Sequence, residues 1–293
     1  MDRLGAIKLF VRLIELGSFT AVARAEGIGQ PAVSKQIYAL EQYLGAQLVS
    51  RTSRQVVVTD AGQTFYESAK QLVDDFDAAE SSVGERQHSP SGLISMSTAP
   101  AHGRLCITPL LPEFFRRYPD IEIQMSVSER QVDLIGEGID LAIRHGQMPD
   151  SSITARKLSE TPFLLVASPA YLARRRAPAR LADLDRHRCI VFAHGRERKP
   201  WEFKVENLSV AYSPQGSFIT GDAEQIRAGV LCGLGISQVP PWLLAAEIES
   251  GEVEVLLPEL QPERLPTYLV HPARRRVPTR VKVLMEYLVT ALE

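Results

Sequence analysis

Apolar side chains recur every three or four residues along the first part of the chain, which is the spacing of helices with one buried face. The first such stripe covers residues 4–14, and Gly17 ends it. Ser18 is suited to cap a second, short helix over 20–26. A third helix begins near Pro31, where a missing N–H does no harm. Its buried stripe consists of Val33, Ile37, Leu40 and Leu44.

The third helix leaves polar side chains outside its stripe, among them Gln30, Ser34 and Lys35. Two helices joined by a tight turn, the second with Gln, Ser and Lys near its start, match a recognition helix in a DNA major groove. Valine-rich residues 48–59 predict a two-stranded wing, and Arg54 near its tip is placed for phosphate or minor-groove contact. From spacing alone, the alternative is a small helical bundle with a solvated polar face.

A longer polar helix is predicted over residues 60–86, with apolar positions at alternating spacings of four and three. So narrow a seam favours pairing with a second copy of the helix, and the alternative is docking on the chain's own domain. The seam consists of Phe65, Ala69, Leu72, Phe76, Ala79 and Val83.

Strands and helices alternate beyond a hinge rich in Ser, Pro and Gly at residues 88–92, which predicts an α/β domain with a parallel sheet. Proline-bounded crossings near Thr161 and Leu265 divide this domain into two lobes with a cleft between them. We expect a DNA-binding domain over 1–59, a linker helix over 60–87 and two lobes. The first lobe comprises 93–161 and 268–293, and the second comprises 162–267.

The formal net charge of −2 argues against a globally basic protein, but charge is unevenly distributed along the chain. Residues 1–59 carry seven Lys or Arg and four Asp or Glu, whereas residues 60–86 carry two and seven. We therefore expect any phosphate-binding surface to lie at the N-terminus.

The cysteines and the apolar segments of the chain indicate in which cellular compartment the protein is found. Cys106, Cys189 and Cys232 are far apart, with no CxxC pair and no clustered histidines, so neither a disulfide framework nor a metal site is predicted. The first residues lack the apolar stretch of a signal peptide, and no segment reaches the roughly 18 apolar residues of a membrane helix. We expect a cytoplasmic protein without cofactor or membrane partner.

Residues 17–62, GSFTAVARAEGIGQPAVSKQIYALEQYLGAQLVSRTSRQVVVTDAG, resemble the DNA-binding module of LysR-type transcriptional regulators. The resemblance continues through LLPEF at 110–114, DLAIR at 140–144 and LGI at 234–236, and so covers essentially the whole chain. It implies an overall α/β protein with an N-terminal winged helix-turn-helix, a long linker helix and a C-terminal two-lobed effector domain. That effector domain resembles type 2 periplasmic solute-binding proteins.

The resemblance also implies partners and contacts. It implies binding to double-stranded operator DNA as homodimers that pair into tetramers. From the expected change in DNA bending, we also expect RNA polymerase as a partner. The DNA contacts implied are Thr20, Gln30, Pro31, Ser34, Lys35 and Arg54. Two positions depart from the family pattern: Glu26 stands where leucine is common, and Gly29 where Ser or Thr caps the helix. Glycine is an acceptable cap, whereas Glu26 puts the packing of that turn in doubt.

The ends of predicted strands and helices supply candidates for effector contacts, because such ends meet at the clefts of α/β domains. The candidates are Thr98, Pro100, His102, Ser128, Arg144, Phe192, Thr220, Asp222 and Pro240. Each also has a structural alternative, such as a helix cap for Thr98 or an ion pair for Arg144. The expected effector is a small organic acid or an aromatic compound.

Two other classes of protein fit the sequence less well. An enzyme is disfavoured because the sequence has no nucleophile elbow, no phosphate-binding loop and no third glycine after Gly233 and Gly235. A transport protein would need an export signal. We therefore expect a sequence-specific transcription regulator whose operator binding or DNA bending is modulated by a small molecule.

Overall fold

The computed structural model forms two compact units, Met1–Leu93 with Arg274–Lys282, and Ile94–Ala273 with Val283–Glu293. Each is described by itself, as the N-terminal and the C-terminal unit. The structure describes residues 2–51, 56–83, 89–130, 132–146, 153–195, 197–206, 208–260, 264–273 and 277–292, with the backbone alone at 51, 77–78, 80–83 and 194.

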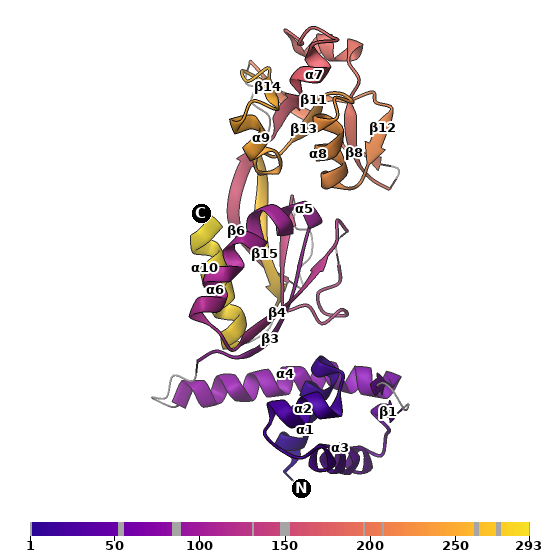
Figure 1. Cartoon of the computed structure of the whole chain (residues 1–293), viewed down its shortest axis with the longest axis vertical. Helices are drawn as coiled ribbons and strands as arrows, with labels where there is room; N and C mark the ends of the chain where they lie inside the picture. The colour runs from indigo at the N-terminus through magenta and orange to yellow at the C-terminus, as the bar shows by residue number, and fades with distance from the viewer. Residues whose placement is uncertain are drawn as a thin grey trace. The chain divides into compact units, whose positions relative to one another are not determined.

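Three short helices and a two-stranded sheet precede the long helix of the N-terminal unit (Figure 1). The elements are α1 (Arg3–Leu16), α2 (Phe19–Ala25), α3 (Gln30–Leu44), β1 (Val49–Arg51), β2 (Val56–Val58) and α4 (Asp60–Val83). Gly17 ends α1 in the left-handed region at a φ of 64°, and the Ser18 hydroxyl accepts from the N–H of Ala21 to cap α2. The chain therefore turns sharply between the helices, as glycine and serine there predict.

The predicted stripes meet in one core, except that Leu44, predicted to be buried at the end of α3, is 38% exposed. Phe10, Leu13 and Ile37 are fully buried, and the ring of Phe65 in α4 lies 5.5 Å from that of Phe10. Gly62 lets the first turn of α4 lie against the chain before β1, because a Cβ there would lie 2.0 Å from the carbonyl oxygen of Leu48. The N-terminal unit is thus held together by α4 as well as by α1–α3.

The first part of the predicted α4 seam differs from expectation. Ala69 is buried and Phe65 is partly buried in the core of the same chain, so these two side chains are covered by the chain's own helices rather than left for a partner. Leu72 and Phe76, by contrast, are 50% and 38% exposed. Ala79 is half-buried, and the side chain of Val83 lies outside the described residues.

A five-stranded sheet forms the first lobe of the C-terminal unit, in the order β4-β3-β5-β15-β6. Its strands are β3 (Gly92–Thr98), β4 (Ile121–Val127), β5 (Leu141–His145), β6 (Ile153–Pro162) and β15 (Arg264–Pro272). β3 and β5 are parallel, but β15 is antiparallel to both β5 and β6, so the sheet is mixed rather than parallel as predicted.

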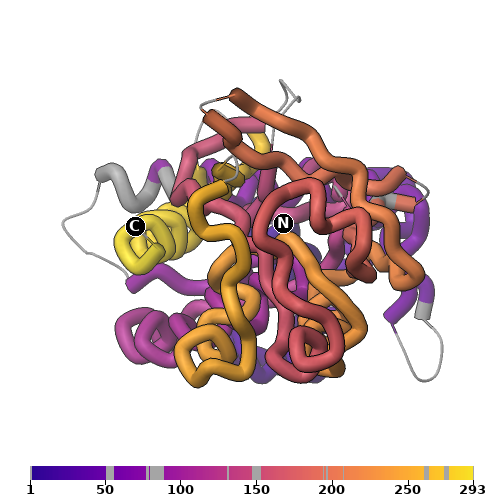
Figure 2. Tube along the Cα trace, turned by 90° about the horizontal axis from the view of Figure 1, so that it is seen from above, coloured from indigo at the N-terminus to yellow at the C-terminus, as the bar shows by residue number. Residues whose placement is uncertain are grey.

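Helices cover this sheet. Residues 100–117 form one helical run made of α5 (Pro100–His102), two irregular turns (Gly103–Ile107 and Thr108–Leu110) and α6 (Leu111–Arg117). The C-terminal helix α10 (Thr279–Leu292) lies beside α6 in both ribbon views (Figures 1 and 2). The ring of Tyr287 in α10 lies 5.3 Å from that of Phe114, tilted by 50°, and its hydroxyl donates to the carbonyl oxygen of Leu110.

The second lobe lies between β6 and β15 in sequence. Its strands form two three-stranded sheets, β12-β8-β9 and β13-β7-β14, and a hairpin of β10 and β11. The strands are β7 (Leu164–Ala167), β8 (Ile190–His194), β9 (Glu197–Arg198), β10 (Trp201–Val205), β11 (Leu208–Tyr212), β12 (Phe218–Thr220), β13 (Ser237–Val239) and β14 (Glu254–Leu256). Its α-helices are α7 (Pro169–Leu172), α8 (Ala223–Leu231) and α9 (Ala245–Glu249), with single turns at Leu181–Arg186 and Pro241–Leu243.

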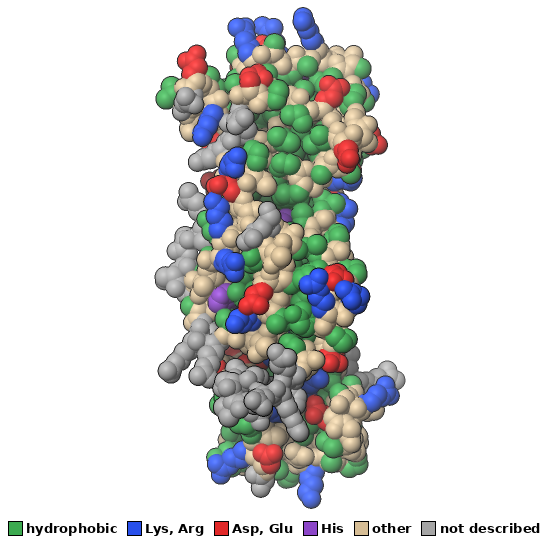
Figure 3. Space-filling model, turned by 90° about the vertical axis from the view of Figure 1, so that its left-hand side faces the viewer, with side chains coloured by type: hydrophobic (Ala, Val, Ile, Leu, Met, Phe, Trp, Pro, Cys, Tyr) green, Lys and Arg blue, Asp and Glu red, His purple; other side chains and the backbone are tan. Residues whose placement is uncertain are grey.

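The long strands β6 and β15 carry the chain between the lobes, and they stay paired from Ile153 and Pro272 to Pro162 and Arg264. Thr267, expected at the end of the second lobe, pairs with His145 in the sheet of the first. Residues 134–138 form a run of turns, and the β10–β11 hairpin was not predicted from the sequence. On the face drawn in Figure 3, basic and acidic side chains are interspersed.

Candidate functional site

The start of α3 is the most exposed polar surface that the sequence analysis singled out. Gln30, Pro31 and Lys35 are exposed and Ser34 is half-buried, while Val33 and Ile37 fix the opposite face in the core. The amide nitrogen of Gln30 donates to the Ser34 hydroxyl over 3.4 Å, so these side chains lie together, one turn apart. Thr20 on α2 is exposed as well. Arg54 lies outside the described residues.

The turn before α3 explains the two departures from the family pattern. Gly29 occupies the cap position with extended backbone and without a side-chain hydrogen bond, and Pro31 follows in the first turn. Glu26, where leucine is common, ends α2, and its carboxylate lies 3.6 Å from Nε of Arg12 on α1. An ion pair at the surface therefore takes the place of an apolar contact at this turn.

Glu41 ties the wing to α3. Its carboxylate accepts hydrogen bonds from the backbone nitrogens of Leu48, at 2.8 Å, and Val49, at 3.1 Å. Beside this junction is an open depression of about 820 Å³ whose walls include Ser34, Lys35 and Tyr38. The arrangement presents hydrogen-bond donors and one positive charge on a rigid helix, which suits contacts with base edges and phosphates.

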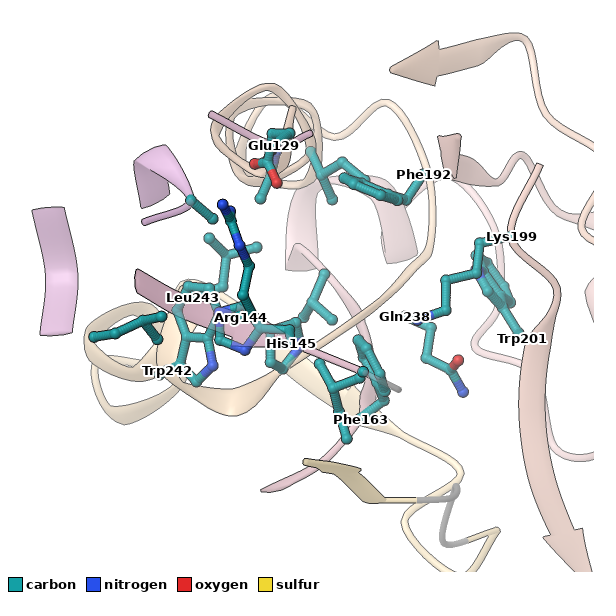
Figure 4. Close-up of a pocket in the computed structure, with 18 of the residues that line it drawn as sticks. Glu129, Arg144, His145, Phe163, Phe192, Lys199, Trp201, Gln238, Trp242 and Leu243 are labelled. Atoms are coloured by element: carbon teal, nitrogen blue, oxygen red, sulfur yellow. Dashed lines mark hydrogen bonds between the residues drawn. The ribbon is translucent and has the colours of Figure 1, made fainter. Parts of the chain in front are cut away.

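A second candidate site is a cavity of about 520 Å³ in the C-terminal unit, within the range typical of small-molecule sites (Figure 4). Most of its walls are apolar or aromatic, with a few polar side chains. The lining residues are Ala99, Ser128, Glu129, Arg130, Ile143, Arg144, His145, Gly146, Phe163, Phe192, Lys199, Pro200, Trp201, Ala223, Ile226, Gln238, Val239, Pro240, Trp242, Leu243 and Leu265. They come from both lobes.

Three cations and one carboxylate face the cavity. Arg144 is buried, and its Nη1 donates to the carbonyl oxygen of Arg130 over 3.3 Å, whereas its Nη2 has no hydrogen-bond partner among the described residues. Arg130 and Lys199 are exposed, and Nζ of Lys199 lies 5.0 Å from the ring centre of Phe163. Glu129 accepts a hydrogen bond from the backbone N–H of Ala223. The cavity therefore carries an excess of positive charge.

Two neutral histidines border the cavity. The ring of His102 lies 4.7 Å from that of His145 and 5.0 Å from that of Trp242. Burial, and then the neighbouring His145, lower the pKa of His102 to about 3; burial, and then Lys199 and Arg144, lower the pKa of His145 to about 4. Both rings are therefore uncharged near neutral pH.

The structure brings together some of the predicted effector contacts and separates others. Ser128, Arg144, Phe192 and Pro240 line the cavity. Thr98 and His102 are buried nearby, and Pro100 begins α5. Thr220 and Asp222 instead cap the start of α8: the Thr220 hydroxyl accepts from the N–H of Asp222, and the Asp222 carboxylate accepts from that of Glu224.

Several lining residues were not among the predicted contacts. Glu129 and His145 directly follow predicted residues, and Trp242 lies two residues after Pro240. Including two further residues after each predicted element end would therefore have found them. Lys199 and Trp201 lie at the start of the unpredicted β10–β11 hairpin, where the sequence offers no such signal. Both tryptophans of the chain, Trp201 and Trp242, line the cavity.

Among the residues that the structure describes, no group of three or more His, Cys, Asp or Glu is arranged to hold a metal ion. None of the described helices combines the length and the apolar character needed to cross a membrane.

Comparison with known proteins matches both units. Residues 4–63 match the family model described as "Bacterial regulatory helix-turn-helix protein, lysR family", and residues 87–293 match the "LysR substrate binding domain". An uncharacterized HTH-type transcriptional regulator of Haemophilus influenzae is 32% identical over 281 residues, which cover 96% of this chain and 98% of that protein.

Solved structures give the same result over the full length. CrgA, a LysR-type transcriptional regulator from Neisseria meningitidis, is similar with a TM-score of 0.66 at 29% identity, covering 98% of each chain. AphB, a virulence activator of Vibrio cholerae, has a TM-score of 0.61 at 25% identity, covering 99% of each. The chain therefore belongs to the LysR family of transcriptional regulators, with an N-terminal helix-turn-helix that binds DNA and a C-terminal domain that binds an effector.

Proposed function

We propose that this protein contacts operator DNA through the start of α3 and responds to a small organic molecule in the cavity between its lobes. In this proposal Gln30, Pro31, Ser34 and Lys35 enter the major groove, with Thr20 and Arg54 on adjoining phosphates. The observation that carries it is the exposure of these α3 side chains on a helix whose opposite face is buried.

The proposed assembly is a homodimer joined through α4, with two dimers pairing into a tetramer. The exposed Leu72 and Phe76 support this contact, since apolar side chains at such spacing on a helix favour a partner helix. Because its partner is DNA, the proposed place of action is the cytoplasm, and its proposed activity is regulation rather than catalysis.

The proposed mechanism is a shift of population. A ligand that binds one arrangement of the two lobes more tightly favours that arrangement, and the paired DNA-binding units then change their spacing on DNA. RNA polymerase would sense the resulting change in DNA bending. The ligand contacts proposed are Ser128, Arg144, Phe192 and Pro240, which line the cavity. Thr98, Pro100 and His102 would support its floor, and Thr220 and Asp222 would act indirectly, by capping α8.

The test of DNA contact combines Ser34→Ala with Lys35→Ala. DNA fragments selected by the wild-type protein from a random pool serve as probes in a gel-shift titration. We expect specific binding to be lost while sedimentation shows an unchanged oligomer. Lys157→Ala, which removes an exposed lysine of the C-terminal unit, is the matched control and should bind as wild type. Unchanged binding by the double variant would contradict the proposed contacts.

A further inference from the structure

The guanidinium of Arg144 has unused hydrogen-bonding capacity inside the cavity. Only 9% of this residue is exposed, its Nη1 is satisfied by the carbonyl oxygen of Arg130, and its buried Nη2 has no hydrogen-bond partner among the described residues. Figure 4 shows the guanidinium turned toward the side of the cavity where Glu129 lies. A buried, incompletely satisfied cation favours an anionic partner.

An acidic side chain of the protein already lies at that side. Glu129 reaches from the first lobe to the first turn of α8 in the second lobe, where Oε1 accepts from the N–H of Ala223 over 3.4 Å. A helix N-terminus attracts negative charge, because its first N–H groups lack partners within the helix. Burial, opposed by this hydrogen bond and reinforced by nearby Asp222, raises the pKa of Glu129. Its ionised form is thus poorly accommodated there.

The rest of the cavity is suited to a flat apolar group. Aromatic side chains of the second lobe stand on several of its sides, with aliphatic residues between them. They are Phe163, Phe192, Trp201 and Trp242. A ligand that satisfied Arg144 would therefore have its acid group at one end and an apolar body at the other.

We propose that the cavity takes a small monocarboxylate with a flat apolar body, whose acid group binds Arg144 and displaces the Glu129 carboxylate from the start of α8. Glu129 acts as a built-in competitor that keeps the site closed to weak anions. This inference rests on the proposed function and names the ligand class of the same cavity. In this proposal Arg144 binds the acid group of the ligand, and the Glu129 carboxylate lowers the affinity for that acid.

Two other ligand classes are distinguishable. An uncharged aromatic ligand would leave Arg144 unsatisfied, and a zwitterionic amino acid would place its ammonium group on Glu129. In the second case Glu129 would be required for binding, whereas in our proposal it opposes binding. Changing Glu129 therefore separates the two by the sign of the effect.

The experiment titrates the full chain with three probes of matched shape: 3-phenylpropionate, its neutral amide and free phenylalanine. Binding is followed by tryptophan fluorescence, which reports on the cavity because both tryptophans of the chain line it. We expect the acid to bind at least about tenfold more tightly than the amide, the factor that a hydrogen bond to a charged group provides.

Variants of Arg144 and Glu129 test which residue causes the preference for the acid over the amide. In Arg144→Met the acid should lose this advantage, while unchanged binding of the amide shows that the cavity is intact. In Glu129→Gln, which removes one competing negative charge, the acid should bind about tenfold more tightly. The affinity for the amide should be unchanged. Arg116→Met, which removes an exposed arginine paired with Glu113 on α6, is the control and should change neither affinity.

Equal binding of acid and amide, or an absence of saturable binding by the acid, would overturn the inference. Weaker binding of phenylalanine after Glu129→Gln, with phenylalanine preferred by the wild type, would replace it by amino-acid recognition. These outcomes leave the proposed DNA contacts untouched, because those are tested separately by gel shift with the α3 variants.

Discussion

Glu129 of the first lobe accepts a hydrogen bond from the backbone N–H of Ala223 in the second lobe, over 3.4 Å. One residue further along α8, Glu224 pairs in two hydrogen bonds with Arg104 of the first lobe, at 2.7 and 2.9 Å. The start of α8 is therefore joined to the first lobe by two carboxylates in opposite electrostatic situations. Burial raises the pKa of Glu129, whereas the hydrogen bond from Arg104 lowers the pKa of Glu224.

The opposite pKa shifts of Glu129 and Glu224 predict that removing each charge changes the stability of the C-terminal unit in opposite directions. Above its ordinary pKa, an ionised carboxyl whose pKa is raised in the folded state destabilises the fold. In the same pH range, an ionised carboxyl whose pKa is lowered in the folded state stabilises the fold. At neutral pH we expect Glu129→Gln to raise the free energy of unfolding of the C-terminal unit and Glu224→Gln to lower it. Urea unfolding followed by tryptophan fluorescence measures both. Effects of the same sign would contradict this account of α8.

The buried histidines predict a dependence of stability on pH. Because the pKa values of His102 and His145 fall to about 3 and about 4 in the fold, the unfolded chain takes up protons that the folded chain does not. Below their ordinary pKa of about 6.5, the unfolding free energy should drop by about 1.4 kcal/mol per pH unit for each histidine, down to about pH 4. Substituting both with glutamine should flatten this slope in urea unfolding. An unchanged slope would show that other groups cause it.

The wing is predicted to depend on Glu41. Glu41→Ala leaves the N–H groups of Leu48 and Val49 without their acceptor. We expect a loss of about 2 kcal/mol in the stability of the N-terminal unit and weaker DNA binding, since hydrogen bonds to a charged group contribute about 1.5–3 kcal/mol. Thermal unfolding followed by circular dichroism, together with gel shift, measures these effects. Gln63→Ala, at an exposed position of α4, should change neither the stability nor DNA binding. Equal losses in both variants would argue against the role of Glu41.

The exposed part of α4 predicts the oligomer contact. Leu72→Glu with Phe76→Glu places charges on two exposed apolar positions of the seam and should shift the protein from dimer to monomer in sedimentation equilibrium. Gln71→Glu adds a charge at the adjacent exposed position and should leave the dimer intact. A dimer that persists in the double variant would place the interface elsewhere.

Periodicity predicted the helices of the N-terminal unit well, because Phe10 and Ile37 lie on regular stripes that one core buries. It could not show that Phe65 and Ala69 pack on α1 while Leu72 does not, since all three occupy the same heptad pattern. The rule that sites gather at element ends led to Arg144. The strand-end rule missed Lys199 and Trp201, because Trp201 begins a β10–β11 hairpin that was not predicted and Lys199 lies just before it.

The most direct test of the central claim, that the start of α3 recognises operator DNA, is selection from a random-sequence DNA pool by the full-length protein. We expect enrichment of two half-sites related by dyad symmetry, about one helical turn (34 Å) or a multiple apart. The protein with Ser34→Ala and Lys35→Ala should enrich no such motif. Enrichment of the same motif by both proteins, or of no motif by the wild type, would contradict the claim.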